Sequence, residues 1–191
     1  MFAKNKGKIG YLKKQPVKVG LVTLLMLAFC CAVFMFGYLT ADSTKNIFTI
    51  IAVLGLLPVA KLIVSFIMYL KAEKYSCPEE KVTKIYDAVG DSDIIYGFDF
   101  YLTSEKKFFP VQVCVIADSS VLCFLAESKS EPNECKEHIE KYLANNSIKG
   151  YKAYVFNDFD KYADRVKTVC EKYEWVDNDT LPFDLMKNLA L

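Results

Sequence analysis

Two long runs of apolar residues dominate the first third of the chain. Val19 to Ala41 form an uncharged run of 23 residues, and Ile47 to Leu70 form a run of 24 that contains one charge, Lys61. About 20 apolar residues cross the hydrocarbon core of a bilayer, so each run predicts a transmembrane helix. Only the polar residues 42–46 separate the runs, and we therefore expect a transmembrane hairpin over residues 19–41 and 47–70.

A secretory signal peptide is the alternative interpretation of the first run. Lysines precede the run, and Leu39, Thr40 and Ala41 loosely resemble a cleavage site. The run is much longer than the roughly 7 to 15 apolar residues of a signal peptide, however, and a second run follows at once. A hairpin explains both features.

Beyond residue 70 the apolar positions follow short periodic patterns that predict a soluble α+β domain. Helical spacing predicts helices over residues 79–89, 130–143 and 159–173, the last capped by Asn157 or Asp158, and a final short helix over 181–191. Strand patterns cover residues 94–103, 108–116, 121–127 and 151–156. The order is α-β-β-β-α-β-α, and short polar connections between the first three strands predict an antiparallel meander sheet with helices packed on it.

Alternation also predicts which side chains share a face of this sheet. On the first strand the shared face holds Ile94, Tyr96, Phe98, Phe100 and Leu102. On the second strand it holds Phe109, Val111, Val113 and Val115. Asp99 falls on the opposite face of the first strand, where we expect exposure to solvent because antiparallel sheets often have one wet face.

The charge distribution predicts the orientation. The chain divides into a basic arm (1–18), the hairpin (19–70), a linker (71–78) and the α+β domain (79–191). Residues 1–71 carry a net charge of +8 and residues 72–191 a net charge of −7. Lysines that flank a transmembrane segment stay on the cytoplasmic side, so we expect both termini in the cytoplasm, with anionic lipid near the arm. The acidic domain argues against binding to nucleic acid.

Two features of composition bear on the source of the protein and on metal binding. Arg165 is the single arginine among 24 basic residues, which is typical of an AT-rich coding sequence, and we expect the plasma membrane of a low-GC bacterium. The seven cysteines form no CxxC pair and have one histidine, His138, to assist them, which argues against a structural zinc site. We expect buried, reduced cysteines, no metal and no cofactor.

One segment resembles a known enzyme core. Glu127, Ser128 and Lys129 end the third strand within an α-β-β-β-α-β order, and this resembles the PD-(D/E)xK nuclease superfamily. The resemblance implies that a strand aspartate and Glu127 hold a metal while Lys129 helps activate or orient water. The family places its aspartate on the second strand, which has no carboxylate here; Asp99 and Asp118 are the substitutes. Glu127, Lys129 and Asp99 are thus candidate catalytic residues of an unusual metal-dependent hydrolase, the alternative being a solvated strand-to-helix junction.

Lys61 is the remaining candidate. It lies ten residues before Lys71, about 15 Å inside the cytoplasmic end of the second span. A lysine at that depth costs roughly 2.5 to 3.5 kcal/mol, so we expect it either to snorkel or to pair with an acidic group of a partner. No phosphate loop, metal cluster or nucleophile motif is present. We therefore expect a membrane-anchored protein-binding or assembly module, with a protein partner or a second copy of the chain, rather than an enzyme.

Overall fold

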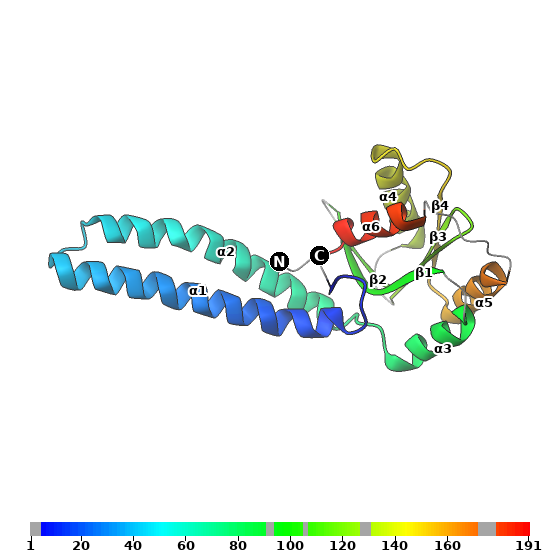
Figure 1. Cartoon of the computed structure of the whole chain (residues 1–191), viewed down its shortest axis with the longest axis horizontal. Helices are drawn as coiled ribbons and strands as arrows, with labels where there is room; N and C mark the ends of the chain where they lie inside the picture. Colours follow the sequence, from blue (N-terminus) through cyan, green and yellow to red (C-terminus); the bar gives the residue numbers. More distant parts are fainter. Residues whose placement is uncertain (1–4, 91–93, 105–106, 127–130, 172–178) are drawn as a thin grey trace. The chain divides into compact units, whose positions relative to one another are not determined.

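The chain divides into two compact units. The computed structural model describes residues 5–90, 94–104, 107–126, 131–171 and 179–191 (Figure 1). Leu12–Lys74 form one unit, and Met1–Tyr11 together with Tyr75–Leu191 form the other. The segment that precedes the hairpin therefore belongs to the same unit as the α+β domain.

The first unit is a hairpin of two long helices, α1 (Tyr11–Ala41) and α2 (Ile47–Glu73). Both are long and apolar enough to cross a membrane, by length and composition. Many of their large apolar side chains are exposed, among them Leu24 at 64% and Leu57 at 69%.

Small residues and one capping side chain hold the hairpin together. A Cβ added to Gly20 would lie 2.9 Å from the ring of Phe66, so the absence of a side chain lets this ring approach α1. Asn46 caps α2, because its Oδ1 accepts a hydrogen bond from the backbone N–H of Thr49 at 2.9 Å. The same side chain donates to the carbonyl of Gly37 at 2.8 Å. The turn thus links the end of α1 to the start of α2.

The second unit contains the predicted elements in the predicted order. They are α3 (Glu79–Val89), β1 (Ile95–Thr103), β2 (Phe108–Ala117), β3 (Ser120–Leu125), α4 (Pro132–Asn145), β4 (Lys152–Phe156), α5 (Phe159–Cys170) and α6 (Thr180–Leu189). Of the two capping residues considered for α5, Asp158 is the cap: its side chain accepts from the N–H groups of Asp160 and Lys161.

The sheet is mixed. Its strand order is β1-β2-β3-β4; the first three strands form the expected antiparallel meander, but β4 runs parallel to β3. The prediction of an antiparallel sheet is therefore wrong for the fourth strand. The connection from β3 to β4 passes through α4, and a helical crossover returns the chain in the same direction.

Helices cover both faces of this sheet. In Figure 1, α4 and α6 lie over one face and α3 and α5 over the other, so the unit has three layers. Each pair of helices closes its own hydrophobic core against the sheet. The strands therefore have a hydrophobic core on each side, and neither face of the sheet is fully exposed to water.

β1 and β2 exchange faces halfway along their length. Phe98 belongs to the core under α3 and α5, whereas Phe100 belongs to the core under α4 and α6. Val113 and Val111 on β2 divide in the same way. The cause is local: Asp99 has a left-handed backbone with φ of 58°, and the pairing of β2 with β3 is irregular between Val111 and Val113. An irregularity of this kind moves the following side chains to the other face.

The predicted faces of both strands are therefore wrong beyond these points. The apolar residues of 94–102 do not share one face, and neither do those of 109–115. Simple alternation assumes an uninterrupted extended backbone, which neither strand has.

The residues that make up the second unit lead to the prediction that it folds without the hairpin. A fragment of residues 75–191 is expected to unfold in one cooperative thermal transition, since it retains both cores. Joining residues 1–11 to it through a flexible linker is expected to raise the midpoint by a few degrees, because these residues belong to the same unit. Circular dichroism melts of both fragments, with a linker-only control, provide the measurement. A disordered 75–191 fragment would contradict the prediction.

Candidate functional site

A buried carboxylate lies on β1 of the second unit. Asp99 is 2% exposed, so the expectation that it faces solvent is wrong. Its carboxylate accepts hydrogen bonds from the Ser76 hydroxyl at 3.2 and 3.0 Å and from the backbone N–H of Cys77 at 2.7 Å. Aspartate tolerates the left-handed backbone better than most residues because its short side chain bonds nearby groups. Asp99 therefore holds the segment that follows α2.

Gln112 holds the same segment from the neighbouring strand. It lies opposite Asp99, between the cross-strand pairs Phe98–Val113 and Phe100–Val111. Its side-chain nitrogen donates to the carbonyls of Tyr75 at 3.2 Å and Ser76 at 3.5 Å.

Lys81 completes this polar cluster. Its ammonium donates to Oε1 of Gln112 at 3.1 Å and lies 4.5 Å from the ring centre of Phe124. Gln112, which lies at the irregularity of β2, therefore joins both α3 and the segment after α2 to the sheet.

Cys77 is not an activated nucleophile. Burial and the Asp99 carboxylate together raise the pKa of its thiol to about 12, although the Lys81 ammonium lowers it in part. A thiol in this state is almost fully protonated at neutral pH, and protonated thiols react poorly. The geometry around Asp99 supports a structural joint.

The same strand also holds the segment that precedes α1. The carbonyl of Gly7 accepts a hydrogen bond from the backbone N–H of Phe98 at 2.9 Å. The neighbouring Lys6 donates to the carbonyl of Ala190 at 2.6 Å, and burial lowers the pKa of this ammonium. Gly7 has φ of 83°, and a Cβ there would lie 3.2 Å from the ring of Phe100. Residues 98 and 99 of β1 thus hold both chain segments that lead to the hairpin.

The C-terminus completes the outer edge of β1. Leu102 forms an antiparallel bridge with Ala190, and the backbone N–H of Leu191 donates to the carbonyl of Tyr101 at 2.9 Å. Backbone groups at a sheet edge readily pair with another chain. Here part of that edge is already paired within the unit.

The other residues named for the hydrolase site are Glu127, Lys129 and Asp118. Glu127 and Lys129 lie outside the described residues. Asp118 lies in the turn between β2 and β3 and is exposed, with φ of 48°. Within the described part of the chain, no group of three histidine, cysteine, aspartate or glutamate side chains is arranged to hold a metal ion.

Lys61 is exposed on α2, and the carbonyl of its backbone accepts the Ser65 hydroxyl at 3.0 Å. The hairpin's two acidic residues, Asp42 and Glu73, lie near its opposite ends. Neither carboxylate lies within a helical turn of Lys61 in the sequence.

His138 has an unusual environment that the sequence did not reveal. It lies on α4 between the rings of Phe109 and Tyr142, at centroid distances of 5.3 and 4.8 Å. One ring nitrogen bonds the carbonyl of Thr103, whereas Nε2 is buried without a partner among the described residues. Burial lowers the pKa of His138, the bond to Thr103 raises it, and the charge of Lys141 lowers it. The net direction is downward, so the neutral form is favoured.

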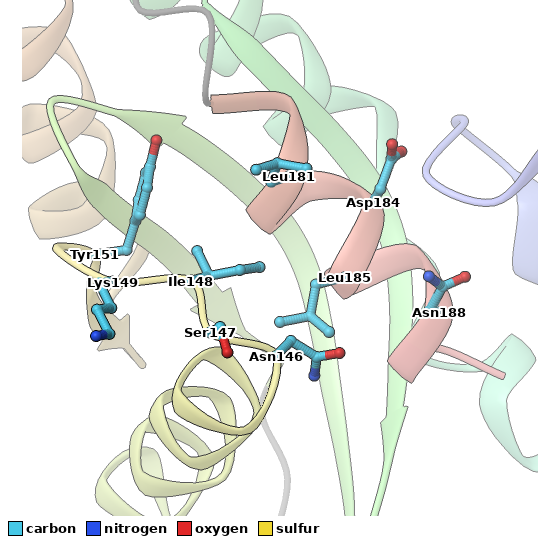
Figure 2. A pocket seen from close by; sticks show the side chains of 9 residues that line it. All are labelled: Asn146, Ser147, Ile148, Lys149, Tyr151, Leu181, Asp184, Leu185 and Asn188. Carbon is cyan, nitrogen blue, oxygen red and sulfur yellow. The ribbon is translucent and has the colours of Figure 1, made fainter.

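A concave surface of this unit lies between α6 and the loop that joins α4 to β4 (Figure 2). We call it the α6 groove. Its volume is about 550 Å³, and its lining residues are Asn146, Ser147, Ile148, Lys149, Tyr151, Leu181, Asp184, Leu185 and Asn188.

Apolar and polar side chains are both present in the α6 groove. Ile148, Leu181 and Leu185 provide apolar surface, and Leu181 is 55% exposed. Asn146, Lys149 and Asn188 provide polar groups around it. Apolar surface surrounded by a polar rim is the usual anatomy of a protein interface.

A partly buried hydrogen bond holds Tyr151, one of the residues that line the groove. The Tyr151 hydroxyl and Oδ1 of Asp179 are 2.6 Å apart, and Asp179 is 1% exposed. This bond joins the start of β4 to the residue before α6.

No protein-family model, curated protein or solved structure matches the chain.

The Asp99 joint leads to a prediction about stability. Asp99→Asn is expected to be the mildest change, since asparagine tolerates the backbone and keeps an acceptor. Asp99→Gly should cost about 1.5 to 3 kcal/mol for the lost hydrogen bonds to a charged group, and Asp99→Ala about 1 kcal/mol more for the left-handed backbone. Urea unfolding of the 75–191 fragment measures these differences.

Asp118→Ala is the matched control for the Asp99 series. Asp118 also has a positive φ, but it is exposed, so this variant reports backbone strain without the loss of a buried hydrogen bond. Equal losses for Asp99→Ala and Asp118→Ala would show that the Asp99 hydrogen bonds contribute nothing.

His138 leads to a prediction about pH. Its pKa in the folded protein is below the ordinary value of 6.5, so the unfolded chain binds the proton more readily. The stability that neutral His138 provides is complete above pH 6.5 and declines as the pH falls toward the folded pKa. His138→Gln cannot titrate, and its unfolding free energy should fall less between pH 7.5 and 5.5 than that of the unmodified chain. Parallel pH profiles would contradict this expectation.

Proposed function

We propose that this protein is a membrane-anchored protein-binding or assembly module, with the α1–α2 hairpin as its anchor and the second unit on the cytoplasmic side. The observation that carries the proposal is the joint on β1, where Phe98 and Asp99 hold the segments on either side of the hairpin. Both flanks of the hairpin therefore start from one folded unit. Two membrane crossings return the chain to the side from which it started, as this arrangement requires.

The exposed apolar surface of the hairpin supports the membrane part of the proposal. Side chains such as Leu24 and Leu57 gain nothing from exposure to water, whereas a bilayer covers them without cost. A cleaved signal peptide fits less well, because cleavage after Ala41 would remove Gly7 and its hydrogen bond to β1. Lysines on both flanks of the hairpin favour a cytoplasmic location for the folded unit.

The α6 groove supports the protein-binding part. It combines exposed apolar surface with asparagine and lysine side chains, which suits a short peptide segment of a partner. The exposed ammonium of Lys61 is a second contact point, which an acidic group of the same partner or of a second copy would satisfy.

Cysteine labelling tests the anchoring. In a cysteine-free variant of the full chain, Thr44→Cys is expected to react with an impermeant reagent in intact cells, because Thr44 lies in the turn of the hairpin. Lys152→Cys should react only after the cells are opened. Labelling of position 152 in intact cells would contradict the cytoplasmic location, and release of the chain by alkaline carbonate would contradict membrane insertion itself.

Site-specific photocrosslinking in native membranes tests the binding surface. A photoreactive residue at Leu181, in the α6 groove, is expected to give discrete adducts of higher mass. The matched control is Tyr86 on α3, which is 43% exposed on the opposite side of the sheet and should give none. Adducts should disappear when Ile148→Asp is added, because a charge removes the apolar surface of the groove. Identical patterns from both positions would argue against a binding role for the groove.

A further inference from the structure

An apolar groove runs between the two helices of the hairpin, near their open end. Its volume is about 700 Å³. The side chains that line it include Val17, Gly20, Leu24, Leu27, Ile63 and Phe66. Gly20 lets the Phe66 ring lie against α1 and so forms the floor. One acidic side chain, Glu73, lies at the end of the groove.

The groove has the length of one membrane leaflet. It extends along α1 from Pro16 to Leu27 and along α2 from Ile63 to Glu73. At about 1.5 Å per residue these segments are roughly 15 Å long, which is half of the roughly 30 Å hydrocarbon core. An acyl chain occupies one leaflet, whereas a third transmembrane helix would need the whole thickness.

Three lysines lie at the open end of the hairpin, close in sequence to residues that line this groove. Lys13 and Lys14 precede Val17 by four and three residues, so they lie one helical turn outside the groove on the same side of α1. Lys71 lies in the last turn of α2, one residue after the groove residue Leu70. All three lysines are exposed, and together they outweigh the charge of Glu73.

A second cavity on the hairpin lacks this cationic end. It measures about 400 Å³ and lies farther toward the turn, with Cys31, Met35, Ala52 and Leu56 among its lining residues. It offers an internal comparison: a similar apolar surface of the same two helices, without lysines beside it.

We propose that the groove at the open end binds one acyl chain of an anionic phospholipid, whose phosphate is held by Lys13, Lys14 and Lys71. This inference rests on the membrane insertion proposed above. The lipid acts as a third element of the hairpin: its chain covers the apolar residues between α1 and α2, and its headgroup neutralises the lysines. The anchor then distinguishes acidic lipid from neutral lipid in the same leaflet.

Native mass spectrometry of the full chain tests this site. The protein is reconstituted in nanodiscs with equal amounts of phosphatidylglycerol and phosphatidylcholine, released, and examined for retained lipid. The unmodified chain should retain phosphatidylglycerol preferentially. Each lysine near an anionic headgroup contributes roughly a fivefold preference, so Lys13→Gln with Lys14→Gln should reduce the preference by roughly 25-fold. Lys45→Gln, a lysine at the turn end of the hairpin, should leave it unchanged.

A filled groove provides the second arm. Leu24→Trp should reduce the retained lipid of either kind, whereas Met35→Trp in the second cavity should preserve the phosphatidylglycerol preference; both positions are exposed on the hairpin, at 64% and 52%. Equal retention of the two lipids by the unmodified chain would overturn the inference, and so would disulfide-linked dimers of a Leu24→Cys variant, which would place a second copy in the groove. Either result would leave the membrane anchor standing. Release of the chain by alkaline carbonate would overturn the anchor and this inference together.

Discussion

The hydrogen bonds of the buried Asp99 carboxylate are the constraint on which much of the second unit depends. A carboxylate removed from water needs donors, and the segment after α2 supplies the Ser76 hydroxyl and the Cys77 N–H. Satisfying it fixes the path of the chain as it leaves the hairpin. The left-handed backbone at Asp99 accompanies this contact and moves the second half of β1 to the other core. One residue thus links the route of the chain to the side-chain pattern of the sheet.

Gln112 extends this constraint across the sheet. It sits where β2 exchanges faces, and it bonds the same segment that Asp99 bonds. Because the two polar residues lie opposite each other, both strands exchange faces at the same level and remain paired throughout. The two irregularities therefore compensate, and the sheet continues without a break in register between β1 and β2.

The sequence predicted the element types and their order, because each helix and strand repeats its apolar positions often enough to reveal its period. It did not predict the exchange of faces. A single left-handed residue leaves no trace in an alternating pattern of apolar side chains, and both sides of these strands are apolar. The available signal was Asp99 itself, a carboxylate among aromatic residues, which we assigned to solvent because one wet face is common. The sheet has helices on both faces, so that assignment was wrong.

The candidate surfaces were harder to predict than the fold. The α6 groove is built from the end of α4, a loop and a helix about 35 residues later, and no local spacing relates these segments. The contact of Gly7 with β1 was also missed, since a short stretch of lysine, glycine and asparagine has no periodicity. Lys61 was identified because a single charge within an apolar run can be recognised from the sequence alone.

The covered edge of β1 has a consequence for biosynthesis. Residues 6 and 7 are synthesised before β1 and Leu191 well after it, yet segments on both sides pair with the same strand. The earliest segment therefore has to wait through the synthesis of both long helices before its partner strand exists. The bridge at Ala190 forms only after the residues between Leu102 and Ala190 have been synthesised. Until then this part of the edge of β1 lacks its partner, so the nascent chain is prone to mispairing there with a neighbour.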